Sequence, residues 1–167
     1  MTGGDVEVKR AQIARERLDR DRHVDPQRGK PAKPGGQVQI TVARDEAELE
    51  YLRSQRLMRF ASASTAGKPD VAPVVFEVDG DTILTGGFDI ATTVRYRNIG
   101  ANPQVCAVVD DLASVDPWSP RGIKVIGTAT IEDGPPPQFR ITPAVIISWG
   151  VNDTTPGIPK MERRSLT

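Results

Sequence analysis

The residue types best suited to chemistry gather between residues 82 and 111. A short strand pattern ends at Gly86-Gly87, and the helix pattern that follows opens with the hydroxyl and cationic side chains of Thr92, Thr93 and Arg95. The first N–H groups of a helix have no intrahelical partner and carry partial positive charge, so a helix start beside a fixed cation attracts anions. This stretch therefore predicts a site that holds an anionic group.

Other side chains that commonly act in catalysis are scarce. His23 is the only histidine, and it lies in a charged N-terminal segment. Cys106 is the only cysteine and stands in an apolar run, which predicts a small buried hydrophobe rather than a nucleophile. These counts argue against an internal disulfide, a Ser-His-Asp triad, a Cys-His dyad and a histidine-based zinc site. The single cysteine suits a reducing cytoplasm, and no catalytic or metal-binding side chain is predicted.

The overall charge limits the classes of partner. The 167 residues carry 22 basic and 22 acidic side chains, a balance that argues against a dedicated nucleic-acid binder. The charge is unevenly spread, because residues 1–36 hold nine Lys or Arg against six Asp or Glu. The sequence has no apolar run typical of a signal peptide or a membrane span, so no membrane partner is expected.

The polarity of the two ends predicts one central domain over residues 37–150. Residues 1–36 are predicted to be a charged, largely flexible extension. Two interpretations of it stay open: a solvated tail, or an arm that crosses onto a partner subunit. Residues 151–167 are polar and contain Pro156 and Pro159, which predicts a loose C-terminal tail.

Hydrophobic periodicity predicts a mainly β chain with a few short helices. Pro73 lacks a backbone donor, which places its strand at an edge or a bulge. The helix after Gly87 is expected to bury Val94 and Ile99, and residues 110–120 are expected to form a loop. Strands are predicted over 37–42, 59–65, 71–78, 82–85, 105–109, 121–131 and 144–149, and helices over 45–56 and 91–99. Short antiparallel strands with short turns favour a closed or split β-barrel over a doubly wound sheet.

The order of several segments resembles a known family. The segment LRSQRLMRFASASTAGKPDVAPVVFEVDGDTILTGG resembles the opening of the pyridoxamine 5'-phosphate oxidase-like split-barrel proteins. The segment TTVRYRNIGANPQVCAVVDD resembles the usual Thr-x-Lys-x-x-Asn-(Ile/Leu)-x-x-Asn-Pro segment of that family. The later strands of the branch that uses the deazaflavin F420 are similar to WSPRGIKVIGTATI and ITPAVIISWG. The resemblance covers about residues 52–150. It implies an FMN-binding-like split barrel of the Greek-key type, which forms a homodimer with cofactor sites at the interface. Members of the family bind FMN, F420 or, less often, haem.

The resemblance also implies roles for individual residues. Thr85, Gly86 and Gly87 would border the cofactor, and Thr92 and Thr93 would donate to its phosphate. Arg95 stands where the family commonly has Lys, and its guanidinium keeps the charge for the phosphate. The strand with Val71, Pro73, Val74 and Val75 would run along the cofactor ring, with its backbone groups serving the polar edge of that ring.

F420 carries an anionic oligoglutamate tail, which asks for further cations. Arg121 is a candidate, together with Arg59, Lys68, Arg97 and Lys124, and the alternative is that these are ordinary solvated charges. Trp118 and Trp149 are expected in core or interface packing rather than on a ligand.

The implied activity is reduction of a conjugated C=C bond in a small organic substrate by hydride from F420H2. A weaker resemblance points to the group that includes dehydrotetracycline reductases of antibiotic biosynthesis. Because hydride chemistry belongs to the cofactor, an enzyme of this kind needs no histidine or cysteine in its site. Two alternatives stay open: an FMN-dependent oxidase or reductase on the same fold, and a non-enzymatic carrier of the cofactor.

Overall fold

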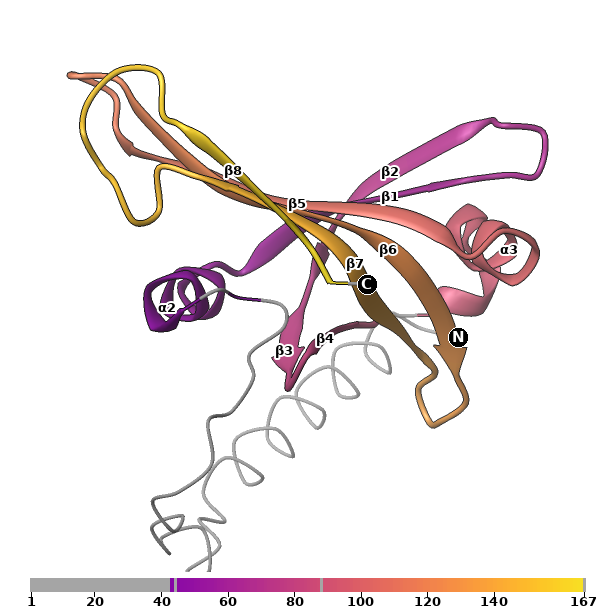
Figure 1. Ribbon diagram of the computed structural model, residues 1–167. Coiled ribbons are helices and arrows are strands. Elements are labelled where there is room, and N and C mark those ends of the chain that lie inside the picture. Colours follow the sequence, from indigo (N-terminus) through magenta and orange to yellow (C-terminus); the bar gives the residue numbers. More distant parts are fainter. Residues whose placement is uncertain (1–42, 44, 88, 167) are drawn as a thin grey trace, which may run out of the picture. The chain divides into compact units, whose positions relative to one another are not determined.

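The protein is described here by a computed structural model, which covers residues 43, 45–87 and 89–166. Eight strands form one antiparallel sheet in the order β2-β1-β5-β6-β7-β4-β3, and β8 pairs with β7 beside that path (Figure 1). The strands are β1 (Leu57–Ala63), β2 (Pro69–Val75), β3 (Glu77–Asp79), β4 (Thr82–Thr85), β5 (Gln104–Ser114), β6 (Ser119–Glu132), β7 (Gln138–Trp149) and β8 (Met161–Ser165). The helices are α2 (Glu46–Ser54), the 3-10 turn η1 (Ile90–Thr92) and α3 (Val94–Ala101). The predicted extension 1–36 and strand 37–42 lie outside the described residues.

The sheet curls so that its first and last strands meet. β2 and β3 stand at opposite ends of the strand order, yet Phe76 alone separates them in the chain. The prediction of one strand over 71–78 is therefore wrong, because β2 pairs with β1 whereas β3 pairs with β4. The curled, half-barrel sheet confirms the predicted mainly β split barrel, and β2, which carries Pro73, is an edge strand as expected.

One face of the sheet forms the core together with the two helices. On β6, Ile123 and Val125 are almost fully buried, as the predicted alternation requires. Other almost fully buried apolar side chains come from the helices and the neighbouring strands: Leu52, Met58, Phe60, Ile83, Ile90, Phe139, Ile141 and Ile146. Helix α2 begins as predicted at Asp45, whose carboxylate accepts from the Glu48 N–H over 3.0 Å.

Helix α3 begins later than predicted. The chain first makes the turn η1, and Thr93 then caps α3 by accepting from the Tyr96 N–H over 3.1 Å. Each residue turns a helix by about 100°, so the later start changes which side chains face inward. Ile99 is buried as predicted, but Val94 is 48% exposed, and Arg95 faces the interior in its place.

Two segments predicted to be irregular form strands. Most of the predicted loop 110–120 belongs to a long β5–β6 hairpin, with its turn at 115–118 and Trp118 more than half exposed. Within the predicted C-terminal tail, β8 pairs with β7 and Arg164 forms an ion pair of 3.0 Å with the fully buried Glu48 of α2. In the part of the chain that the structure describes, no helix has the length and apolar character needed to cross a membrane.

Candidate functional site

A cavity opens where β2 ends and β4 ends. The Thr85 hydroxyl donates to the carbonyl oxygen of Val75 over 2.7 Å and so ties the last residues of these two strands together. The cavity has a volume of about 210 Å³. Its lining residues are Val75, Phe76, Glu77, Leu84, Thr85, Gly86 and Gln138. We call it the β2–β4 cavity; it brings together three of the residues predicted to border a cofactor, namely Val75, Thr85 and Gly86.

Gly86 borders the β2–β4 cavity beside Gln138. A Cβ atom built on Gly86 would stand 3.7 Å from the Cβ atom of Gln138, an ordinary contact that the backbone would tolerate. The glycine is therefore not forced by local crowding, and its effect is to leave room beside Gln138. Gly87, the next residue, leads into the turn that starts α3.

The predicted residues of β2 divide between two faces of the sheet. Val71 and Val75 are 65% and 59% exposed, and Pro73 is exposed beside them on the same face. Val74 points the other way and is buried. Among the described strands only β1 pairs with β2, so the other edge of β2 has no strand partner there. The exposed residues and the free backbone edge are the parts of β2 able to meet a ligand.

The hydroxyl groups of Thr92 and Thr93 are used within the turn that starts α3. Thr92 donates to the Asp89 carbonyl oxygen over 3.0 Å, and Thr93 donates to the Ile90 carbonyl oxygen over 2.6 Å. A hydroxyl has one proton to donate. Both hydroxyl protons are thus used within this turn, and Thr93 also caps α3; the predicted donation to phosphate stays a prediction.

Arg95 is the most unusual residue of the predicted site. Its residue surface is only 8% exposed, and its guanidinium carbon lies 5.6 Å from the ring centre of Phe60 and 5.7 Å from that of Phe139. The buried Nε atom has no hydrogen-bond partner, and no ion pair to Arg95 is found among the described residues. Burial lowers the pKa of Arg95, an effect that the negative charge of Asp70 opposes.

Phe139 links Arg95 to the β2–β4 cavity. It lies opposite Thr85 in the pairing of β4 with β7, and its ring is one of the two that flank the guanidinium. Neither Arg95 nor Phe139 lines the cavity itself, but Phe139 directly follows Gln138, which does. A largely buried cation near a cavity with a free backbone edge is suited to a flat ligand with an anionic end. Phe60 and Phe139 were not predicted as site residues, because an aromatic side chain at an inward position of a strand has the same pattern as any core residue.

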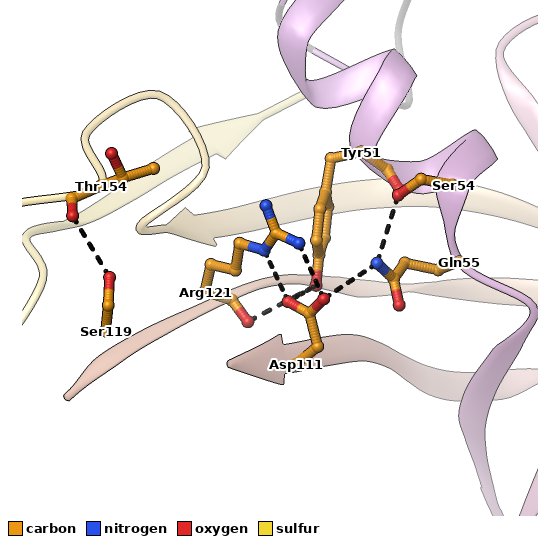
Figure 2. Close-up of polar contacts among 7 residues, drawn as sticks. All are labelled: Tyr51, Ser54, Gln55, Asp111, Ser119, Arg121 and Thr154. Carbon is orange, nitrogen blue, oxygen red and sulfur yellow. Dashed lines mark hydrogen bonds and ion pairs between the residues drawn. The ribbon is translucent and has the colours of Figure 1, made fainter. Parts of the chain in front are cut away.

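Arg121 belongs to a different part of the molecule (Figure 2). It forms a bidentate ion pair with Asp111, over 2.7 Å from Nε and 2.9 Å from Nη2, and lies over the ring of Tyr51. The Tyr51 hydroxyl and Gln55 also donate to that carboxylate, over 3.3 and 3.1 Å. The hydrogen bonds from Arg121 lower the pKa of Asp111, and burial raises the pKa of Tyr51. This cluster joins α2 to the turn end of the β5–β6 hairpin.

The distance along β6 separates Arg121 from the rest of the predicted site. Ile131 pairs with Phe139 beside Arg95, and it lies ten residues beyond Arg121 on the same strand. At about 3.3 Å per residue, that is roughly 33 Å. Within one chain, Arg121 therefore lies far along β6 from Arg95 and Phe139. No group of three or more His, Cys, Asp or Glu side chains placed to hold a metal is found in the described ranges.

Comparisons with known proteins agree with this fold. The sequence profile described as pyridoxamine 5'-phosphate oxidase matches residues 45–149. The 5a,11a-dehydrotetracycline/5a,11a-dehydrooxytetracycline reductase of Streptomyces rimosus is 34% identical over 125 residues, which cover 68% of this chain and 88% of the reductase.

Two solved structures are similar in fold. The heme binding protein of Mycobacterium smegmatis has a TM-score of 0.56 at 15% identity, over 74% of this chain and 60% of that one. A conserved hypothetical protein of Mycobacterium tuberculosis has a TM-score of 0.55 at 19% identity, over 66% and 87%. At these identities the likeness concerns the fold alone.

Proposed function

Since the chain belongs to the pyridoxamine 5'-phosphate oxidase family, we propose that it is an F420-dependent reductase that acts on a conjugated C=C bond of a secondary metabolite. The family and the 34% identical reductase support the broader class, an oxidoreductase with a flavin-type cofactor. The segments that resemble the F420 branch support the choice of cofactor. The substrate of the Streptomyces reductase supports the choice of substrate class.

The observation that carries this proposal is the environment of Arg95. A buried guanidinium Nε atom that has no hydrogen-bond partner is costly to a protein unless an acceptor completes it. The first turn of α3 adds unpaired backbone N–H groups to the same place. A cofactor phosphate would supply the missing acceptor, so the residues present fit a phosphate-bearing group.

The cofactor ring would lie along the free edge of β2 and reach the β2–β4 cavity. The exposed side chains of Val71, Pro73 and Val75 offer it an apolar surface, and Gly86 offers space. When bound, the reduced deazaflavin supplies a hydride to one carbon of the conjugated bond, while a proton is taken up at the other. The chain's own work is then to bind, to orient and to keep water from the reacting atoms.

We also propose that the protein is a homodimer with a cofactor site at its interface. The outward face of β1 and β2 exposes Leu57, Val71 and Val75, an apolar surface that a second copy would cover. Leu57→Asp should shift the protein toward the monomer in sedimentation equilibrium, whereas Ile158→Asp, at a fully exposed residue, should not. A monomeric wild-type protein at assay concentrations would end the proposal.

Parallel titrations with F420 and FMN test the cofactor. Quenching of F420 fluorescence should give a dissociation constant in the micromolar range or below, and FMN should bind more weakly. Tighter binding of FMN would assign the chain to the FMN-dependent members instead. Failure of both cofactors to bind would overturn the proposal.

Turnover separates an enzyme from a carrier. F420H2 should lose its electrons, with recovery of the F420 absorbance, when 5a,11a-dehydrotetracycline is added as acceptor. An enone of another ring system serves as the second acceptor. Tight binding of F420 with no oxidation by either acceptor would favour the carrier.

A further inference from the structure

A carboxylate lies on the same face of the sheet as Arg95. Asp70 is the second residue of β2 and stands opposite Ser62 of β1, so these two side chains share one face. Phe60, whose ring flanks the Arg95 guanidinium, is two residues before Ser62 and therefore points to this face as well. Asp70 is thus a diagonal neighbour of a ring that Arg95 contacts.

Helix α3 brings Arg95 toward this carboxylate. The helix packs against β1 and β2, and its Asn98 donates to the buried hydroxyl of Ser62 over 3.1 Å. Arg95 is three residues before Asn98, on the same side of the helix, and both residues are buried. The negative charge of Asp70 acts on Arg95, yet no ion pair joins these two residues in the described part of the chain.

Three further charged residues lie in or beside this part of the chain, and all three are exposed. They are Lys68 in the connection from β1 to β2, Asp89 in front of η1, and Arg97, which donates to the Thr92 carbonyl oxygen over 3.2 Å. Arg97 is two residues after Arg95, a rotation of about 200° around the helix, so its side chain leaves on another side. Water and salt screen exposed charges more than buried ones. The charge at the proposed phosphate site is therefore set mainly by one largely buried cation and one half-buried carboxylate.

We infer that Asp70 makes this site select a phosphate diester, which carries one negative charge, over a phosphate monoester, which carries two. The inference rests on the proposed function, because the anion it concerns is the cofactor phosphate beside Arg95. The second ionisation of a phosphate monoester has a pKa of about 6, so the phosphate of FMN carries about two charges at pH ~8. The phosphate of F420 is a diester between the ring-bearing chain and the oligoglutamate tail, and it carries one charge.

A single negative charge matches what the chain supplies. Arg95 and Asp70 together are neutral, so the attraction of Arg95 for a second negative charge is opposed by Asp70. A dianion also loses more hydration than a monoanion when it enters a site shielded from water. The buried Nε–H group and the first N–H groups of α3 are donors that either ester can use, so they add affinity without selecting between the two.

The test compares two ligands that differ only at the phosphate. One is the ring and ribityl part of F420 with a terminal phosphate, and the other is the methyl ester of that phosphate. Asp70→Asn removes the charge and keeps the shape of the side chain. Asp81→Asn makes the same change in the exposed turn between β3 and β4. Quenching of deazaflavin fluorescence at pH ~8, where the free phosphate is a dianion, gives both dissociation constants for each protein without reduced cofactor or acceptor.

We expect wild type to bind the methyl ester about tenfold more tightly than the free phosphate. Asp70→Asn should bind the free phosphate more tightly and reduce the preference to about twofold or less, whereas Asp81→Asn should retain it. Equal binding of the two ligands by wild type, a preference for the free phosphate, or a preference that survives in Asp70→Asn would overturn the inference. Because the preference is a ratio of two dissociation constants from one preparation, a misfolded fraction in a variant does not change it.

Binding and turnover separate this inference from the proposed function. Oxidation of F420H2 by an enone, in a protein that binds both ligands equally, would overturn the inference and leave the proposed function intact. A protein that prefers the methyl ester through Asp70, but oxidises F420H2 with none of the acceptors, would count against the proposed reductase and support this inference. Failure of both ligands to bind would overturn both.

Discussion

Replacement of Arg95 by Met separates a ligand-binding arginine from a structural one. Met has a similar length and no charge, so it fills the space between Phe60 and Phe139 without a buried cation. If the role of Arg95 is to bind an anionic ligand, the substitution should leave the ligand-free protein as stable as before or make it more stable. The same substitution should weaken cofactor binding.

Two opposing contributions set the size of the change in stability of the free protein. Each ring contributes about 0.5–2 kcal/mol to a guanidinium at the observed 5.6 and 5.7 Å. Removing the charge of a residue that is only 8% exposed recovers part of the desolvation cost of a buried ion, a cost of several kcal/mol. We therefore expect the free energy of unfolding to rise by about 0–2 kcal/mol. For binding, loss of a charge-assisted hydrogen bond costs about 1.5–3 kcal/mol, or roughly 10- to 150-fold in the dissociation constant.

Urea denaturation without ligand and fluorescence titration with F420 measure the two effects separately. Arg56→Met is the matched control, because Arg56 is exposed and lies between α2 and β1. It should change neither quantity beyond about 0.5 kcal/mol. A loss of more than about 1 kcal/mol in the stability of free Arg95→Met, together with unchanged F420 affinity, would show instead that Arg95 serves only in packing.

Further predictions concern the strands and the turn end of the β5–β6 hairpin. Thr85→Val removes the hydrogen bond to the last carbonyl of β2 and should cost about 1–2 kcal/mol in urea unfolding; no loss would show that this bond does not hold the two strands together. Gly122→Ala places a Cβ atom 2.4 Å from Trp149, so it should cost about 1–3 kcal/mol and shift tryptophan fluorescence, whereas Gly100→Ala in α3 should stabilise by about 0.5–1 kcal/mol. Equal effects of the two alanines would contradict the described packing. Asp111→Asn should lower the free energy of unfolding above pH ~4, the ordinary pKa of the carboxyl. The difference in unfolding free energy from wild type should shrink as the pH falls through the lowered folded-state pKa of Asp111. A difference that stays constant down to pH ~2 would refute the ion pair.

Much of the fold followed from short-range patterns. Alternation placed β1, β4, β6 and β7, and Asp45 marked the start of α2, because these signals depend on neighbours in the sequence. The break at Phe76 was missed, since a continuous alternating run carries no sign that its two halves pair with different strands. The long β5–β6 hairpin was missed because Asp, Ser and Pro residues resemble a loop, although pairing along both strands outweighs that tendency.

The candidate site could be predicted in part. Thr85, Gly86 and Val75 were named from the resemblance, and the structure brings them to one cavity. Arg121 was grouped with them only by its charge, and an ion pair to Asp111 set by strand register was not visible in the sequence. The aromatic rings around Arg95 were equally hidden, because which core side chains meet depends on the curl of the sheet.

The unequal length of the strands has a consequence for how the molecule opens. β5, β6 and β7 pair over 11 to 14 residues each, whereas β3 has three residues and β4 has four. Amide protons of the long strands should exchange with solvent only when the whole domain unfolds, while those of β3 and β4 exchange through local opening. The β2–β4 cavity is bordered by both of these short strands. A bound ligand would therefore slow deuterium uptake most at β3 and β4. Hydrogen exchange at these strands would then report that a ligand is bound, even for a ligand that gives no absorbance change and is not turned over.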